Sequence, residues 1–465
     1  MVMPSAGEIA GSVWFIGVAL IAASVCCNAQ AVDDVWKAGV ARCDITPQEP
    51  MWLAGYGNRD RPSEGTLHPL WAKALAVEDA EGHRAVLVTS DLLGFPKAMS
   101  DRIRDRLGDT FGLLRAQIIL NGSHTHSGPV LEDSLYNIYP FEEDETEKIE
   151  RYSRGLEDQI VALVGNALNS LVPARLFSAN GVTRFAVNRR NNAETQILDN
   201  HDLKGPVDHA VPVLKVARDD GALLAVVFGY ACHATTLNAY QWCGDYPGFA
   251  QLELEAAHPG AAALFFAGCG ADQNPLPRRT VPLAQQYGRE LAAAVERVLA
   301  DPMKTLAPSL KAEYAEIELA LSPPPNREEL VQLARGQVGI PRRAAKRFLA
   351  SLDQGEPLPV TYPYPVQLWR LGDQTVLSLG GEVVVDYAIA LKGILGPDTF
   401  IMAFSNDLLG YVPSLRVLRE GGYEGDTSQM EYELPSKWAE DIESRITSAV
   451  RELAAKTGMG ENARH

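Results

Sequence analysis

The feature that most limits the fold of this chain is a recurring order of segments: a short apolar strand, a loop of small or polar residues, and then a helix. An apolar stretch at 116–120 runs into a loop that begins at Asn121, and the apolar stretches 223–228 and 264–266 end in similar loops. Proteins of the α/β class place their chemistry in loops of this kind, at strand ends. The repeated order therefore predicts an α/β fold with a large mixed sheet core and flanking helices.

Apolar runs and turn residues predict the remaining elements. Further strands are expected at 40–45, 74–78, 85–90, 211–216 and 399–404, and a hairpin is expected at 366–379 around Gly372-Asp373. Helices are expected at 100–107, 149–171, 284–300 and 438–454. Prolines bracket the segment 323–359, which carries a basic helical stretch and is expected to be a helical insertion or lid.

Composition narrows the class of protein. The chain has 465 residues, of which 46% are hydrophobic and 22% are charged, as in folded globular proteins rather than disordered or coiled-coil chains. It carries 42 Lys and Arg against 59 Asp and Glu, a formal net charge of −17. A chain this acidic has no general electrostatic attraction to nucleic acid, so nucleic acid is not expected as a partner.

The N-terminus predicts export. The apolar run Val13 to Val25 is too short to span a bilayer, which takes about 20 helical residues, and an Ala-x-Ala pattern follows at Ala29 and Ala31. We therefore expect a signal peptide at 1–31, a periplasmic or secreted location, and one catalytic domain at 32–465. A lipoprotein anchor on Cys26 or Cys27 is the less favoured alternative. The residues just before them, Ala23, Ser24 and Val25, lack the usual order of a branched residue followed by small ones.

Four cysteines remain after the expected leader, namely Cys43, Cys232, Cys243 and Cys269. In an oxidising compartment they permit three full pairings, between which the sequence does not choose. Buried free thiols are the alternative. Cys232 precedes a histidine, but alternation along an extended backbone turns neighbouring side chains apart, so we assign it to the core rather than to a metal.

The sharpest chemical signal is the pair His124 and His126. Alternate residues of an extended segment project to the same side, and two imidazoles on one face suit a metal ion or a charged intermediate. Zinc requires three or four donors, of which His233 and Glu382, each at the end of another predicted strand, are the best further candidates. The alternatives are a hydrogen-bonded surface pair for the first two residues, and capping or core roles for the other two.

A set of motifs in this order resembles the neutral/alkaline ceramidase family, zinc amidohydrolases that cleave the N-acyl bond of ceramide. The resemblance covers most of 38–440, and the Ser-His-Thr-His-Ser-Gly-Pro stretch carries most of its weight. The motifs are Asp44-Ile45-Thr46-Pro47, Ser123 to Pro129, Asn188-Arg189, the His233 segment, Gly244-Asp245-Tyr246-Pro247-Gly248, Pro365-Val366-Gln367 leading to Gly381-Glu382, and Tyr423-Glu424-Gly425.

The resemblance implies roles for individual residues. It implies that zinc is held by His124, His233, Glu382 and Tyr411. It also implies that His126 and Arg189 act on the substrate beside the scissile carbonyl, where both can donate hydrogen bonds to an oxyanion.

The chain departs from the family pattern in two ways. Gln273 stands where the family has a serine implicated in catalysis, and a glutamine cannot be a nucleophile. Zinc-activated water does not need that serine. The family also carries a C-terminal β-sandwich domain, which we expect this chain to lack because it stops soon after the helix at 438–454. Long-chain ceramide itself is therefore in question as the substrate.

These observations predict a zinc-dependent amidohydrolase that cleaves a ceramide-like N-acyl bond with metal-activated water. The substrate is a small molecule or lipid with an N-acyl group, peripheral contact with a membrane is compatible with it, and no oligomeric state is set. Asp272 and Asp245 are weak candidates for the general base, with loop capping as the alternative. Two other functions stay open: a zinc hydrolase of ester, phosphate or sulfate bonds, and a non-catalytic exported binding protein, which Gln273 favours.

Overall fold

The computed structural model describes residues 35–139, 141–199 and 202–459, which belong to one compact unit. Its largest feature is a nine-stranded mixed sheet with the order β11-β9-β8-β6-β1-β3-β4-β5, in which β13 also pairs with β6. The pairs β4–β5 and β9–β11 are parallel and the others are antiparallel. The strands are β1 (Trp36–Asp44), β3 (Trp71–Glu78), β4 (Arg84–Ser90), β5 (Ile118–Gly122), β6 (Val172–Val182), β8 (Ala210–Arg218), β9 (Leu223–Tyr230), β11 (Ala262–Ala267) and β13 (Lys304–Leu306).

A second sheet of four strands packs on one face of the first. Its order is β14 (Leu310–Ala320), β15 (Thr361–Leu371), β16 (Gln374–Leu379) and β18 (Phe400–Met402). Alternate side chains of both sheets meet in one apolar layer, in which the rings of Phe266 and Phe400 stack with centroids 6.4 Å apart. This alternation is what two packed sheets require, since each strand turns every second residue inward.

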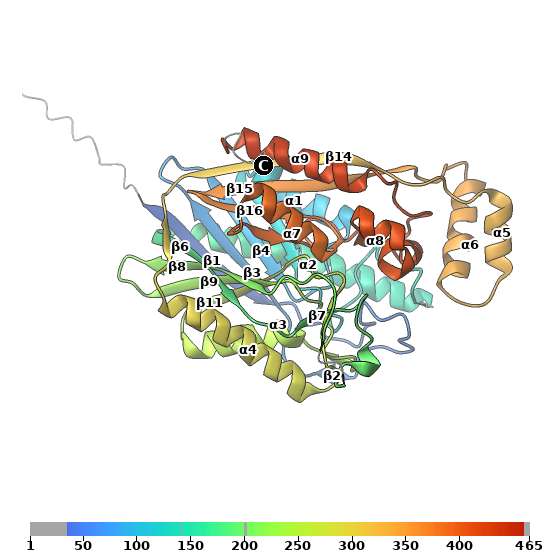
Figure 1. The fold of residues 1–465 in the computed structure, drawn as a ribbon, viewed down its shortest axis with the longest axis horizontal. Helices are drawn as coiled ribbons and strands as arrows, with labels where there is room; N and C mark the ends of the chain where they lie inside the picture. The colour runs from blue at the N-terminus through green and yellow to red at the C-terminus, as the bar shows by residue number, and fades with distance from the viewer. Residues whose placement is uncertain (1–34, 140, 200–201, 460–465) are drawn as a thin grey trace, which may run out of the picture. The chain divides into compact units, whose positions relative to one another are not determined.

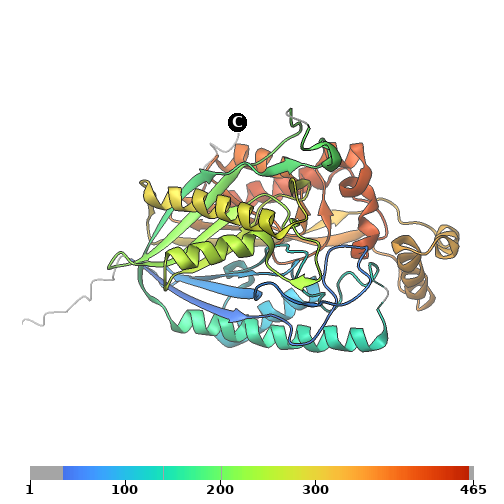
Figure 2. The same ribbon diagram turned by 90° about the horizontal axis from the view of Figure 1, so that it is seen from below.

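Helices cover the outer faces of the two sheets (Figures 1 and 2). On the large sheet lie α2 (Glu143–Asn169), α3 (Asp245–Ala257) and α4 (Val281–Ala300), and α1 (Lys97–Phe111) packs beside α2. On the small sheet lie α7 (Val385–Leu395) and α9 (Ile442–Lys456), with α8 (Leu415–Glu420) nearby. The predicted α/β class with a large mixed sheet and flanking helices is confirmed.

Two helices, α5 (Arg327–Arg335) and α6 (Ile340–Asp353), form a hairpin that stands apart from the sheets at one end of the unit (Figure 1). They lie inside the segment 323–359, where a helical insertion was expected. Leu330 and Phe348 are buried between them in a small core of their own. Asn326 begins α5 by accepting hydrogen bonds from two amides of the first turn, a capping box.

Short strands and turns lie around the strand ends. The strands are β2 (Gly65–Thr66), β7 (Ala186–Asn188), β10 (Gln241–Trp242), β12 (Gln273–Pro275), β17 (Glu382–Val383) and β19 (Tyr411–Val412). The short helical turns are η1 (Arg115–Gln117), η2 (Glu194–Gln196), η3 (Tyr423–Thr427) and η4 (Gln429–Tyr432).

Several elements have no counterpart among the sequence expectations, among them the two long strands β6 and β14 and the helix α3. The strand β14 is mostly half-exposed and carries three glutamates, so its sequence lacks a continuous apolar run. The first turn of α3 contains Pro247 and Gly248, which are typical of loops in sequence. Burial of the helix against β11 outweighs this local preference.

The structure also bears on the cysteines. Cys43, Cys232, Cys243 and Cys269 are free thiols, and Cys232 lies in the apolar core as expected. Among the described residues no helix is long and apolar enough to cross a membrane. The expected signal peptide and the lipoprotein alternative fall at 1–31, outside the described residues.

Candidate active site

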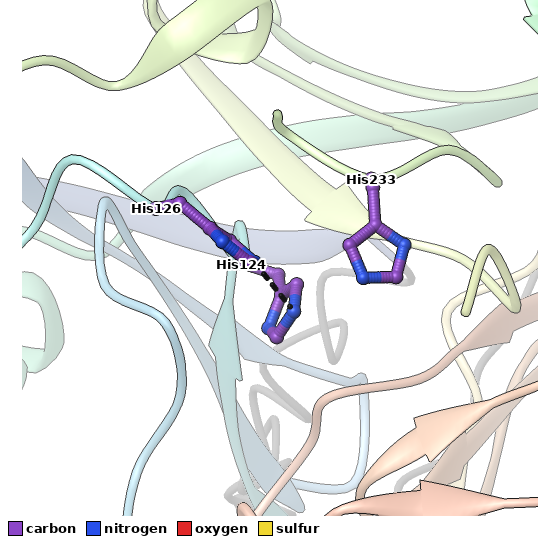
Figure 3. Close-up of side chains that lie close together, drawn as sticks. All are labelled: His124, His126 and His233. Carbon is purple, nitrogen blue, oxygen red and sulfur yellow. Dashed lines mark hydrogen bonds between the residues drawn. The ribbon is translucent and has the colours of Figure 1, made fainter. Parts of the chain in front are cut away.

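Two histidines of the site come from the loop that follows β5. The expectation that this stretch is extended is wrong at His124, whose φ is 59°, in the left-handed region. The turn there brings the Nε2 atoms of His124 and His126 within 3.3 Å of each other (Figure 3). The two imidazoles therefore converge because of a backbone turn rather than through strand alternation.

The third histidine and a carboxylate arrive from two other strand ends. His233 lies in the loop after β9, and Glu382 opens β17 after the Gly380-Gly381 turn. The Glu382 Oε2 atom lies 3.3 Å from Nε2 of His124 and 3.1 Å from Nε2 of His233. One ring nitrogen from each of His124, His126 and His233 lies within 4.8 Å of the others, and we refer to these three residues as the histidine cluster.

The outer ring nitrogens explain how two of the imidazoles are oriented. Nδ1 of His124 lies 2.8 Å from the carbonyl oxygen of Leu93, and Nδ1 of His233 lies 2.8 Å from that of Gly270. Because a carbonyl oxygen only accepts, each Nδ1 carries the proton and each Nε2 presents a lone pair to the cluster. Metal-binding histidines are held in this way. The donor set of imidazole nitrogens and one carboxylate thus fits a divalent metal ion such as zinc.

Burial and nearby charges shift the pKa values of His126, His233 and Glu382. Burial lowers the pKa of His233 to about 4, with the positive charge of Arg189 acting in the same direction. Burial also lowers the pKa of His126 well below its usual value, and His124 and His233 add to this effect. Burial would raise the pKa of Glu382, but the interactions with His124 and His233 outweigh it and hold that pKa well below the usual range. Neutral imidazoles beside a carboxylate are the forms that bind metals.

Tyr411 and Arg189 lie side by side next to the cluster. Tyr411 pairs with Glu382 in the β17–β19 ladder, and its ring is parallel to that of His233 with centroids 6.5 Å apart. The Tyr411 hydroxyl accepts a hydrogen bond of 2.9 Å from Nη2 of Arg189. The guanidinium is in turn held by Glu424, whose Oε1 accepts from Nε at 2.8 Å. The structure thus brings Tyr411 and Arg189 together as one hydrogen-bonded pair.

Gln273 does not direct its side chain to the histidine cluster. Its amide nitrogen donates to the carbonyl oxygen of Ala231, and its Oε1 accepts from the amide of Asp208 at 3.4 Å. Its main-chain oxygen accepts from the amide of His233 at 2.9 Å. Gln273 therefore anchors the segment that carries His233.

The two aspartates considered as general bases also serve as anchors. Asp272 accepts from the amide of Val385 at 2.8 Å and from the side chain of Asn188 at 3.0 Å, and burial raises its pKa to about 6. Asp245 accepts from the amides of Thr236 and Leu237, just after His233. The hydrogen bonds of both carboxylates thus hold loops of the site in place.

Several residues of the site escaped the sequence analysis. Tyr432 donates a hydrogen bond to Oε1 of Glu382, and the ring of Phe404 lies 4.2 Å from that of His124, centroid to centroid. Neither position carries a local signal. Glu424 lies within the quoted Tyr423-Glu424-Gly425 motif, which was its only indication. Gly55 is a further case: its φ is 102°, and a Cβ there would lie 2.4 Å from Cγ of His126.

Part of the chain is similar in sequence to known proteins. Residues 36–273, about half of the chain, match the family described as "Neutral/alkaline non-lysosomal ceramidase, N-terminal". Neutral ceramidase from Drosophila melanogaster is 28% identical over 280 residues, covering 55% of this chain and 37% of that protein. The protein of the same name from Pseudomonas aeruginosa is 28% identical over 240 residues, covering 49% and 34%. The chain thus matches little more than a third of the length of these relatives.

Solved structures show the same fold. The crystal structure of neutral ceramidase from Pseudomonas aeruginosa superposes with a TM-score of 0.71 at 19% identity, covering 91% of this chain and 75% of that one. A ceramidase complexed with C2 gives a TM-score of 0.71 at 18% identity. The matched segment contains all three members of the histidine cluster. The chain belongs to the neutral/alkaline non-lysosomal ceramidase family.

Proposed function

We propose that this protein is a zinc-dependent amidohydrolase that cleaves the amide bond of an N-acyl, ceramide-like compound. The observation that carries the proposal is the approach of His124 Nε2 and His233 Nε2 to one oxygen of Glu382, at 3.3 and 3.1 Å. Both imidazoles have their other nitrogen bonded to a carbonyl oxygen, so their lone pairs face the same point. Membership of the ceramidase family supports the bond type.

His124, His233 and Glu382 would hold the ion, with Tyr411 as the fourth member of the set. A zinc ion at this position supplies Lewis acidity toward a carbonyl group and toward water. The protein's own contribution is to keep these side chains oriented and away from bulk solvent. His124, His233 and Glu382 are each about 1% exposed.

His126 and Arg189 are the groups proposed to act on the substrate. His126 is neutral because its pKa is low, and its Nδ1 has no hydrogen-bond partner among the described residues. Its Nε2 faces the histidine cluster and is the atom proposed to exchange a proton with the attacking water and the leaving amine. Arg189 donates a hydrogen bond to Tyr411 and carries a fixed positive charge beside the proposed ligands, which suits the stabilisation of an oxyanion there.

The proposed route uses water directly and no side-chain nucleophile. The resemblance places Gln273 at the position of the family serine, and its side chain forms hydrogen bonds with Ala231 and Asp208. A metal-assisted attack by water needs neither an acyl-enzyme nor a serine.

The substrate and the location are further parts of the proposal. One related structure is a ceramidase complexed with C2, which favours an N-acyl lipid as the substrate class. We also propose export, on the basis of the apolar run Val13 to Val25 and the pattern at Ala29 and Ala31.

The test measures bound metal and hydrolysis on the same preparations. Wild-type protein should carry about one zinc per chain by elemental analysis and release fatty acid from N-acyl lipids in a panel that also contains esters, phosphates and sulfates. His124→Ala and Glu382→Gln should each lose the zinc, and hydrolysis should fall by a factor of about a hundred or more. His258→Ala, a histidine outside the cluster that pairs with Glu296, should behave as the wild type. Full hydrolysis by His124→Ala would contradict the assignment.

A further inference from the structure

A cavity of about 350 Å³ lies behind the carboxylate of the histidine site. It is formed by the start of α1, the start of β15 and the loops at 133–135, 407–409 and 432–434. Much of its wall is apolar and includes Pro96, Leu135, Pro363, Leu408 and Leu434. Its size is within the range of small-molecule sites.

One wall carries a buried carboxyl group, of which only one oxygen accepts a hydrogen bond from the described residues. Asp407 is 2% exposed, and its Oδ2 accepts a hydrogen bond of 2.8 Å from the hydroxyl of Tyr362. Its Oδ1 has no hydrogen-bond partner within the described part of the chain. Burial raises the pKa of this carboxyl to about 7. Burying a carboxylate oxygen without a partner costs free energy, which a donor bound in the cavity would offset.

No basic side chain among those that line the cavity forms an ion pair with Asp407. Lys97 lines the cavity, but its ammonium is paired with Asp101 at 3.0 Å and with Glu316 at 2.9 Å. The other charged residues of the wall are acidic: Asp133, and Glu433, which pairs with Arg347 at 3.0 Å. The cavity therefore combines apolar surface with an excess of negative charge.

The cavity is separated from the histidine site by one side chain. Tyr432 lines the cavity and donates its hydroxyl hydrogen to Glu382. Leu409, also on the wall, would lie 3.0 Å from a Cβ added at Gly381, the residue before that glutamate. A ligand here would lie against the reverse side of the turn that positions Glu382.

We propose that this cavity binds an apolar ammonium compound, a primary amine that carries an alkyl group. The ammonium donates hydrogen bonds to Asp407, and the alkyl group lies against the proline and leucine side chains. The site does not depend on the hydrolase activity proposed above. If that activity is present, the amine released from an N-acyl lipid belongs to the same chemical class.

The probe is n-octylammonium, titrated by calorimetry into the full chain, with octanoate and octanol as matched ligands. Wild-type protein should bind octylammonium at least about tenfold more tightly than either matched ligand. Asp407→Asn should weaken the binding about tenfold or more, because the ion pair is lost. Asp301→Asn, which removes an exposed aspartate paired with Arg297, should bind as the wild type does.

Two more variants keep the proposal open to refutation. Ala98 lines the cavity and is exposed, so Ala98→Trp should narrow the cavity without disturbing the core and should weaken octylammonium binding. This variant tests the proposal if Asp407→Asn fails to fold. His124→Ala should lose hydrolysis yet bind octylammonium normally, which separates this proposal from the proposed function. The ammonium-site proposal is wrong if folded Asp407→Asn or Ala98→Trp binds octylammonium with unchanged affinity. It is also wrong if His124→Ala loses the binding or if octanoate binds as tightly as octylammonium.

Discussion

Single hydrogen bonds to main-chain oxygens determine how the histidines of this site face one another. Leu93 and Gly270 each accept a proton from the outer nitrogen of one imidazole, so the inner nitrogens are free to bind a metal. Gln273 belongs to the same network, since its main-chain oxygen accepts from the amide of His233. Gln273 thus has a positioning role that is visible in its contacts.

We expect Gln273→Ser to lower stability without adding a nucleophilic route. A serine side chain is too short to replace the hydrogen bond that the Gln273 side-chain amide donates to the carbonyl oxygen of Ala231. That buried oxygen therefore loses its partner, at a cost of about 1–3 kcal/mol. Thermal unfolding should show a lower Tm, and rapid-quench kinetics should show no burst of acyl-enzyme. Exposed Gln286→Ser is the matched control and should unfold like the wild type. Faster hydrolysis with a burst would show that the serine position is catalytic here too.

At the scale of elements, strand ends position the site, and the helical hairpin stands apart from the sheets while α6 contacts η4, which carries Tyr432. The ends of β5 and β9 and the start of β17 each contribute a side chain. The strands β5 and β9 are not neighbours in the sheet order, but β11, which pairs with β9, also contacts β5. The α5–α6 hairpin has its own small core, which includes Leu330 and Phe348. This separation predicts that the hairpin can be loosened while the sheets remain intact.

Phe348→Ala tests that separation. Removing a buried phenylalanine ring costs about 3–5 kcal/mol, and here the loss should fall on the hairpin core and on η4, whose Met430 packs against that core, rather than on the sheets. Hydrogen exchange measured by mass spectrometry should become faster in peptides from 327–353 and stay unchanged in β4, β5 and β9. Val338→Ala, at a side chain that is 81% exposed, is the control and should alter neither. Faster exchange throughout the sheets would show that the hairpin is part of one cooperative core.

At the scale of the whole molecule, the candidate metal site joins segments that are far apart in the chain. Glu382 follows the small sheet, whereas His124 and His233 follow strands of the large sheet. An ion bound between them would link the two sheets. A ligand that binds only the folded state stabilises it, by about 4 kcal/mol when its concentration is a thousand times its Kd.

Removal of the metal should therefore destabilise the entire unit. We expect dialysis against a chelator to lower the Tm of wild-type protein by several degrees in calorimetry, and added zinc to restore it. The His124→Ala variant should already unfold at the lower temperature and should not respond to the chelator. A chelator-insensitive wild type that carries full activity would contradict a structural and catalytic ion at this position.

The sequence by itself determined the fold class, most strands and helices, and the residue types of the site. Apolar runs such as 116–120 and 223–228 identify strands because they can only be buried, and His124, His233 and Glu382 stand at their ends. The elements β14 and α3 could not be found in this way, because tertiary packing outweighs their local signals.

Only the tertiary structure decided how the site is assembled. The left-handed turn at His124, the hydroxyl of Tyr432 on Glu382 and the commitment of Gln273 to Ala231 all depend on contacts between segments distant in the chain. Sequence periodicity describes which face of one element is buried. It does not specify which carbonyl, hydroxyl or carboxylate from another segment a side chain will meet, and those meetings set the orientation and charge of the site.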